Sequence, residues 1–245
     1  MKALEIDNTI AEAYPSSGFI KMGIDYDWKG AEKELRRAIE LSPGNAKAHH
    51  WYGWYLIYRG RFEEAIKEIK RALELDPLSL VINRNLGAML YYSRQYDLAI
   101  ETLQKTIDMN PNFIEAHAFL GLAYLEKSMY EEALAEVQKE YELTRGSHPY
   151  VEIWLGFVYV RMGKRDKAQE LLDDMLKRSK KTYVSPYSLA TLYLILGEKD
   201  QGFKWMEKAY EERDGLTRLR IDPYFDIIRS DPRFKALLKK VGLDK

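Results

Sequence analysis

The sequence predicts an all-α fold, an α-solenoid in which about six helix-turn-helix units stack into a right-handed superhelix. Two observations support this fold class. A set of alanines recurs every 34 residues, each three positions after an aromatic side chain: Ala31, Ala65, Ala99 and Ala133. Glycines stand twelve positions before such alanines, and prolines follow several of them by twelve. A fixed period of this length is typical of stacked helical repeats.

Each unit is expected to hold a first helix, a short turn and a second helix across residues 9–213. The first helices are expected to start near residues 11, 46, 80, 114, 149 and 183. Prolines at 43, 77 and 111 close the early units, because proline cannot continue a helix. One extra residue lies between Gly18 and Ala31 and another between Thr144 and Pro149, so we expect local changes of superhelical pitch there.

The two ends depart from the repeat. Residues 2–8 resemble residues 71–77, where a second helix ends, so we interpret residues 1–8 as the end of a truncated upstream repeat helix in a fragment of a longer protein. Asp222-Pro223 and Asp231-Pro232 each place an N-cap acid before a proline. We therefore predict that residues 214–245 form a short helical cap that seals the last face of the solenoid, with a docking helix for a partner as the alternative.

The unit resembles the tetratricopeptide repeat, because Trp51-Tyr-Gly53, Ala65, Ala72 and Pro77 fit its signature in one register. Other segments are similar to the C-terminal arrays of prokaryotic multidomain signalling proteins, which carry winged-helix, adenylate cyclase or serine/threonine kinase domains. Among these segments are Tyr26-Asp-Trp28, Val184-Ser-Pro-Tyr187 and Ser230-Asp-Pro-Arg-Phe234. The resemblance implies a sensory or scaffolding segment, with any catalytic residues outside this chain.

The composition limits the function classes. Lys plus Arg and Asp plus Glu both number 38, and this zero balance offers no electrostatic footprint for nucleic acid or an anionic membrane. The absence of cysteine excludes disulfides, thiolate zinc sites and cysteine nucleophiles. No stretch approaches the roughly 18 consecutive apolar residues of a membrane helix. We therefore expect no nucleic-acid contacts, no membrane association and a cytoplasmic location.

Patterns of catalysis and metal binding are missing. His49 and His50 are adjacent and point about 100° apart on a helix, and Glu115-x-His117 also lacks the spacing of a zinc-binding helix. Glu131-Glu132 belongs to a solvated helix face. No phosphate-binding glycine loop and no nucleophile elbow occur. The sequence thus predicts no enzyme activity, no metal site and no cofactor.

The resemblance implies a binding site on the concave face. In tetratricopeptide arrays the first helices line that face, and a fixed set of positions along each helix points into it. These positions give an aromatic and apolar groove with few cations: Lys47, His50, Trp54, Tyr58, Arg84, Ala88, Tyr91, Leu122, Phe157 and Arg161. Such a groove suits an apolar peptide or an amphipathic helix, including one from the same polypeptide. The alternative is that the aromatic residues pack between neighbouring first helices.

The leading functional prediction is a non-catalytic protein–protein interaction scaffold that binds a peptide or helix in this groove, as the regulatory arm of a larger signalling protein. One alternative is self-association through the exposed N-terminal repeat end, giving a monomer or weak homodimer. Another is a small-molecule sensor, which would need a closed pocket with converging polar groups. If Trp54 and Arg84 face an open groove, their replacement by alanine should lower partner affinity with little loss of thermal stability.

Overall fold

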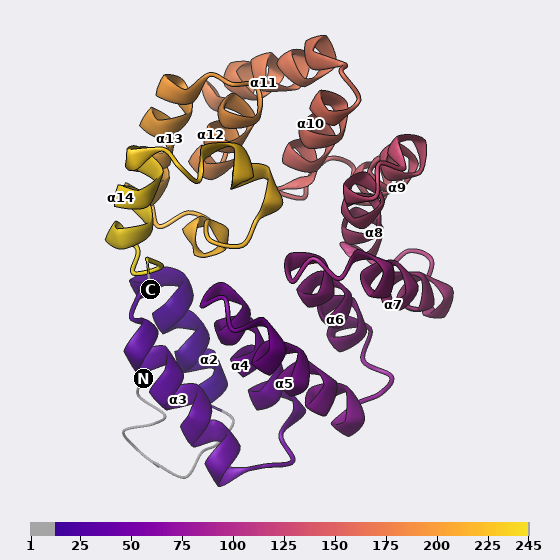
Figure 1. Cartoon of the computed structure of the whole chain (residues 1–245), viewed down its shortest axis with the longest axis vertical. Helices are drawn as coiled ribbons and strands as arrows, with labels where there is room; N and C mark the ends of the chain where they lie inside the picture. The colour runs from indigo at the N-terminus through magenta and orange to yellow at the C-terminus, as the bar shows by residue number, and fades with distance from the viewer. Residues whose placement is uncertain (1–12, 245) are drawn as a thin grey trace.

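The computed structural model describes residues 13–244, and the expectations for residues 1–8 and for a helix start near residue 11 lie outside them. The described part of the chain is helical without strands, which confirms the predicted α-solenoid (Figure 1). The repeat units pair α2 (Ala13–Ile20) with α3 (Trp28–Leu41), α4 (Ala46–Tyr58) with α5 (Phe62–Leu75), α6 (Leu80–Tyr92) with α7 (Tyr96–Met109), α8 (Ala116–Glu126) with α9 (Tyr130–Thr144), α10 (Val151–Arg161) with α11 (Arg165–Ser179), and α12 (Pro186–Ile195) with α13 (Lys199–Glu211).

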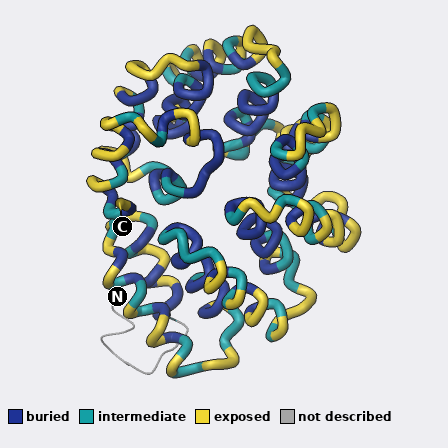
Figure 2. Tube along the Cα trace, viewed as in Figure 1, coloured by how far each residue is buried: buried dark blue, intermediate teal, exposed yellow. Residues whose placement is uncertain are grey.

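Each second helix also packs on the first helix of the next unit, as α3 does on α4 and α7 on α8. Exposed residues lie mainly on the outward-facing second helices, and buried residues concentrate on the first helices (Figure 2). The repeat alanines are fully buried where the two helices of a unit meet. The array therefore owes its order to contacts between elements that are close in sequence.

Three first helices begin slightly later than predicted. Before α8, Glu115 has a left-handed φ of 66°, a conformation that cannot belong to an α-helix. Before α12, Ser185 is the N-cap and its side chain accepts a hydrogen bond from the Ser188 amide at 3.1 Å. Pro186 occupies the first turn, where its missing N–H costs nothing. Helix α10 likewise begins at Val151 instead of near residue 149.

The extra residue of the first unit forms a π-helical turn. Helix α2 continues into η1 (Lys21–Asp25), and the Asp27 amide donates to the Lys21 carbonyl oxygen at 2.8 Å. A π turn holds more residues than an α turn, so it takes up the insertion without breaking the helix. At the second insertion, α9 extends to Thr144 and the chain then reverses through Arg145 and Gly146, both with positive φ.

The last part of the chain closes the array into a ring. It contains η2 (Leu216–Arg218), η3 (Pro223–Ile228) and α14 (Pro232–Lys240). Figure 1 shows η2 and η3, in yellow, crossing the middle of the ring, with the C-terminal end beside the first unit. The Trp28 indole N–H donates to the Val241 carbonyl oxygen at 2.6 Å, and Arg59 Nη1 donates to the Gly242 carbonyl oxygen at 2.5 Å.

The arrangement differs from a simple terminal cap over residues 214–245. Helix α14 does lie against the end of the array, where Arg233 pairs with Asp200 and Lys240 pairs with Glu207. Residues 214–229, which we name the central segment, instead turn back into the ring. They do so because their leucine, isoleucine and aromatic side chains find an apolar concave surface to pack on.

Candidate functional site

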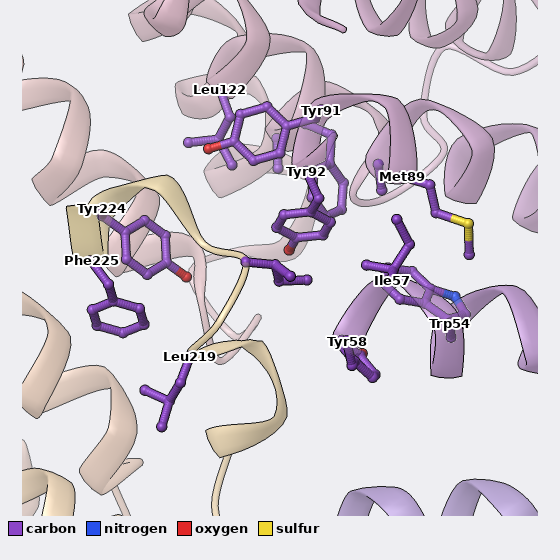
Figure 3. Close-up of a cluster of buried hydrophobic side chains, with 14 of the residues drawn as sticks. Trp54, Ile57, Tyr58, Met89, Tyr91, Tyr92, Leu122, Leu219, Tyr224 and Phe225 are labelled. Atoms are coloured by element: carbon purple, nitrogen blue, oxygen red, sulfur yellow. The ribbon is translucent and has the colours of Figure 1, made fainter. Parts of the chain in front are cut away.

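The concave side of the ring, formed by α4, α6, α8, α10 and α12, is here named the groove, and the central segment fills it. The inward side chains of the segment are buried: Leu216, Leu219, Ile221, Tyr224, Phe225 and Ile228. They share one hydrophobic core with Tyr58, Tyr92 and Phe157 of the groove. Figure 3 shows Leu219, Tyr224 and Phe225 of the segment in the same cluster of side chains as Tyr58 and Tyr92.

The segment enters the groove at the N-terminus of α12. The Asp214 carboxylate accepts hydrogen bonds from the Ser185 hydroxyl at 2.6 Å and from the Tyr187 amide at 3.1 Å. An anion at this place satisfies free N–H groups and complements the helix dipole. Gly215 follows with a φ of 75°, and a Cβ there would lie 2.7 Å from Tyr187 Cγ. Only glycine allows this close turn into the groove.

Arg218 brings a positive charge into the middle of the groove. Its guanidinium carbon lies 4.5 Å from the centre of the Tyr150 ring, within the range of a cation–π contact. The Glu115 carboxylate lies in the same part of the groove. Burial would raise the pKa of Glu115, but a hydrogen bond from His148 and the charges of Arg84 and Arg218 outweigh it and lower this pKa to about 2. Glu115 is therefore ionised and balances the two guanidinium groups.

Asp222 places a carboxylate among tyrosine hydroxyls. Its Oδ2 accepts hydrogen bonds from Tyr187 at 3.0 Å and from Tyr224 at 2.7 Å, and Tyr92 bonds to it as well. The residue is only 1% exposed. Burial raises the pKa of Asp222 from 3.8 to about 6, although the Arg218 charge and the tyrosine hydrogen bonds act in the opposite direction.

Two further contacts hold the far end of the segment. The Tyr224 ring stands edge-on to Phe157 of α10, with ring centres 5.6 Å apart. At the exposed rim, Arg94 Nη2 donates to both carboxylate oxygens of Asp226, at 2.7 and 3.0 Å. Arg94 lies in the turn between α6 and α7, so this ion pair ties η3 to the middle of the array.

Most of the predicted groove residues are buried instead of open to solvent. The buried members are His50, Trp54, Tyr58, Ala88, Tyr91, Leu122 and Phe157. Of the three predicted cations, Arg84 and Arg161 are partly buried and Lys47 is exposed, and each has a partner within the chain. Arg84 pairs with Glu115 at 2.5 Å, Arg161 pairs with Glu126 at 3.4 Å, and Lys47 Nζ lies 3.5 Å from Ser16 Oγ.

The predicted residues divide into two groups by what they contact. Tyr58 and Phe157 contact the central segment, through Arg218 and Tyr224 respectively. Trp54 and His50 of α4 instead contact the neighbouring first helix α6: Asn85 Nδ2 donates to His50 Nε2, and the Trp54 and Tyr92 ring centres lie 6.3 Å apart. Within α4, the Trp54 indole N–H also donates to His50 Nε2 at 3.2 Å. Burial, followed by the charges of Arg84 and Lys47, lowers the pKa of His50 to about 4.

The sequence interpretation missed several residues that hold the central segment. Tyr187, Arg218 and Asp222 are not among the predicted groove residues, and the sequence predicts Asp222 to be a helix N-cap. The available signal was the composition of residues 216–228, which are rich in leucine, isoleucine and aromatic residues. A polar terminal cap does not need such a composition, whereas a segment buried in a groove does.

Within residues 13–244, no three histidine, aspartate or glutamate side chains are grouped so that they could hold a metal ion. No helix in the same part of the chain has both the length and the apolar character needed to cross a membrane.

Comparison with known proteins identifies the repeat. Family models of the tetratricopeptide repeat match residues 46–79 and residues 85–148. No curated protein sequence matches the chain significantly. Among solved structures, the chain is similar to PilW, described as a widely conserved type IV pilus biogenesis factor, with 20% sequence identity and a TM-score of 0.63 over 78% of this chain and 86% of that chain.

Two further structures share the fold. A thermophilic tetratricopeptide-repeat protein from Thermus thermophilus, TTC0263, is 19% identical, with a TM-score of 0.63 over 77% of this chain and 98% of that chain. A chain of the APC/C hetero-tetramer Cut9-Hcn1 is 16% identical, with a TM-score of 0.65 over 98% of this chain and 44% of that chain. At these identities the likeness shows the fold alone. The family matches and the fold together show that this chain carries tetratricopeptide repeats, stacked in an α-solenoid.

Proposed function

We propose that this chain is a non-catalytic protein-interaction scaffold that binds a peptide or helix in its groove, as the regulatory arm of a larger cytoplasmic signalling protein. Tetratricopeptide-repeat proteins generally mediate protein–protein interaction. One observation carries the proposal for this chain: the groove already holds a polypeptide segment, the central segment, through apolar, aromatic and charged contacts. Its surface therefore has the chemistry that peptide binding requires.

A partner and the central segment compete for the same surface. Because the segment belongs to the chain, it acts at an effective concentration on the order of millimolar, which a separate protein rarely reaches. The intact chain should therefore bind a partner weakly, and a chain with a weakened central segment should bind it strongly. This behaviour suits a regulatory arm, since release of the segment would control access.

The test uses the full chain and two matched substitutions in the central segment. Leu219→Glu puts a charge at a fully buried position, and Ile227→Glu puts the same charge at a position that is 56% exposed. An uncompensated buried charge is strongly unfavourable, so only the first substitution should release the segment. Quantitative mass spectrometry would then compare the proteins captured from a cell lysate by the wild type and both variants.

The expected result is a protein enriched about tenfold on Leu219→Glu over the other two chains. Adding Tyr150→Ala to Leu219→Glu removes a groove side chain that contacts the segment, and should reduce the capture of a true groove partner. Proteins that bind any exposed apolar surface would remain. If all three chains capture the same proteins, the groove is not the partner site.

Self-association is a second candidate function, supported by one exposed apolar surface. Phe19, Ile20 and Ile24 on α2 and η1 are 41%, 49% and 49% exposed. Ile20 corresponds to Tyr55 of the next unit, which contacts Trp28 of the preceding second helix. Light scattering across a range of concentrations should then show a rise in mass that Ile20→Glu removes. A constant mass would exclude this candidate.

A further inference from the structure

We propose that the groove recognises a defined peptide pattern, Arg-Leu-x-x-Asp-Pro followed by two aromatic residues. Residues 218–225 of the central segment carry this pattern. A partner that carries it would bind the groove in exchange for the segment. The inference rests on the proposed function and deepens it by naming the class of ligand, a peptide with one cationic and one acidic anchor and an aromatic pair.

The first anchor of the pattern is an arginine. The Arg218 guanidinium lies over the face of Tyr150, and Glu115 supplies a negative charge nearby. A planar guanidinium stacks on an aromatic ring, whereas the compact ammonium of lysine is more strongly hydrated and does not stack in the same way. The groove therefore favours arginine over lysine at this position.

The second anchor is an acid, and a comparison within the chain shows that its carboxylate serves the groove. Asp231 and Asp222 both begin an Asp-Pro-x-Phe sequence. The Asp231 side chain caps its own helix, accepting the Arg233 amide at 2.9 Å. The Asp222 side chain makes no such cap and instead accepts the Tyr187 and Tyr92 hydroxyls of the groove. Burial raises the pKa of Tyr187, which keeps this hydroxyl protonated as a donor.

The last part of the pattern is a proline and an aromatic pair. Pro223 restricts the backbone at the start of η3, which lowers the entropy lost on binding. Tyr224 packs edge-on against Phe157, and Phe225 packs against Tyr187 with ring centres 6.1 Å apart. The two rings thus contact two different first helices of the array, α10 and α12. Buried aromatic side chains of this kind carry much of the affinity in peptide recognition.

The experiment measures binding of a labelled synthetic peptide with the sequence of residues 214–230 to full-length Leu219→Glu, by fluorescence anisotropy. The peptide should bind this variant in a saturable manner. It should bind the wild type and Ile227→Glu at least about tenfold more weakly, because their own central segment occupies the groove. Peptides with Arg218→Lys or with Asp222→Ala should lose about tenfold in affinity for Leu219→Glu, and a scrambled peptide should not bind.

A second variant designed to release the central segment is the control for loss of the fold in Leu219→Glu. If circular dichroism shows that Leu219→Glu has lost helix, the full chain with Arg218→Ala and Asp222→Ala replaces it, because that pair removes both polar anchors without adding a buried charge. If both variants lose their helix, the central segment is an obligatory part of the core and the proposal is wrong. Equal binding of the native and scrambled peptides by a folded variant, or no binding of either, would also overturn it.

The outcomes separate this inference from the proposed function. A protein captured by Leu219→Glu but not displaced by the native peptide would support a scaffold whose ligand has another pattern. Specific peptide binding without any captured protein would support the pattern and count against a partner in that lysate.

Discussion

At the scale of single residues, two histidines, His49 and His117, each bridge the second helix of their unit and the turn that precedes the unit; we name them the bridging histidines. His49 places Nδ1 at 2.6 Å from Glu68 and Nε2 at 3.0 Å from the Pro43 carbonyl oxygen. His117 makes the equivalent contacts with Glu136 and Pro111, at 2.6 and 2.9 Å. Each ring therefore connects a closing proline to the second helix of the following unit. A doubly protonated imidazolium satisfies both acceptors.

The bridging histidines should make the free energy of unfolding depend on pH above about 6.5. The hydrogen bond to Glu68 raises the pKa of His49. For His117, burial lowers the pKa, but the bonds to Glu136 and Pro111 outweigh it and raise the pKa overall. A raised folded-state pKa gives stability that is complete below the unfolded pKa and is lost as pH rises through the folded pKa.

The measurement is urea unfolding of the wild type and of His49→Gln/His117→Gln between about pH 6 and pH 8. The wild type should lose more free energy of unfolding over this window than the double variant, because glutamine does not titrate. If the free energy of unfolding changes with pH equally in the two proteins, the bridging histidines are not charged in the folded state.

The structure also changes the expectation for Trp54. Its side chain is only 6% exposed, and its ring packs near Tyr58 and Tyr92. Trp54→Ala should therefore lower the free energy of unfolding by about 3–5 kcal/mol. Val81→Ala, on an exposed side chain of the neighbouring first helix, should change it by less than about 0.5 kcal/mol. Chemical denaturation of both variants checks this, and a small loss at Trp54 would mean that its pocket is more open than described.

At the scale of helices, close approach of α6 and α7 depends on a glycine. A Cβ on Gly87 would lie 2.4 Å from Leu103 Cγ, much closer than two carbon atoms can pack. Gly87→Ala should therefore cost about 1–3 kcal/mol through overpacking. Gly44→Ala is the matched control, because a Cβ there meets no atom within 4 Å. Thermal melts of the two variants should differ clearly, and equal melting temperatures would show that α7 shifts freely.

The sequence predicted these helices well because their signals are local. A glycine or alanine recurs at each contact, and in the first four units an aromatic residue stands three positions before the alanine. The starts of α8 and α12 were less accurate, since they depend on the left-handed Glu115 and the Ser185–Pro186 cap instead of the repeat. The extra residue between Gly18 and Ala31 predicts a local change of pitch in the first unit, but it does not predict that the chain forms a π turn at η1.

At the scale of the whole molecule, the central segment should be held in the groove more strongly at low pH because of Asp222. In the closed state the segment occupies the groove, and in the open state it is released. The pKa of Asp222 is about 6 when the central segment is in the groove, against 3.8 for an ordinary aspartate. The closed state thus binds more protons than the open one between these values, so closure strengthens as pH falls and weakens as pH rises through about 6. Arg218 keeps its charge over this range, and the surrounding tyrosines stay neutral because burial raises the pKa of Tyr92, Tyr187 and Tyr224.

Hydrogen exchange measured by mass spectrometry tests this prediction on residues 216–228. After correction for the intrinsic exchange rate, protection in the wild type should rise between about pH 6.5 and pH 5, by up to about 1.4 kcal/mol per unit of pKa shift. Asp222→Asn should remove the pH dependence, because the amide does not titrate. A wild-type protection that is flat over this window would show that Asp222 does not control closure.

The sequence by itself determined the repeating helices, their order and their packing on neighbours. These contacts join residues about one unit apart, so each leaves a periodic trace in the chain. Only the tertiary structure decided that the array closes into a ring and that the central segment fills its groove. The contacts responsible, Trp28 with Val241, Arg59 with Gly242 and Arg94 with Asp226, join residues 213, 183 and 132 positions apart. These contacts depend on the total curvature of the array, to which every unit contributes. The spacing of residues within one unit does not reveal that total, so the sequence pattern does not predict closure of the ring.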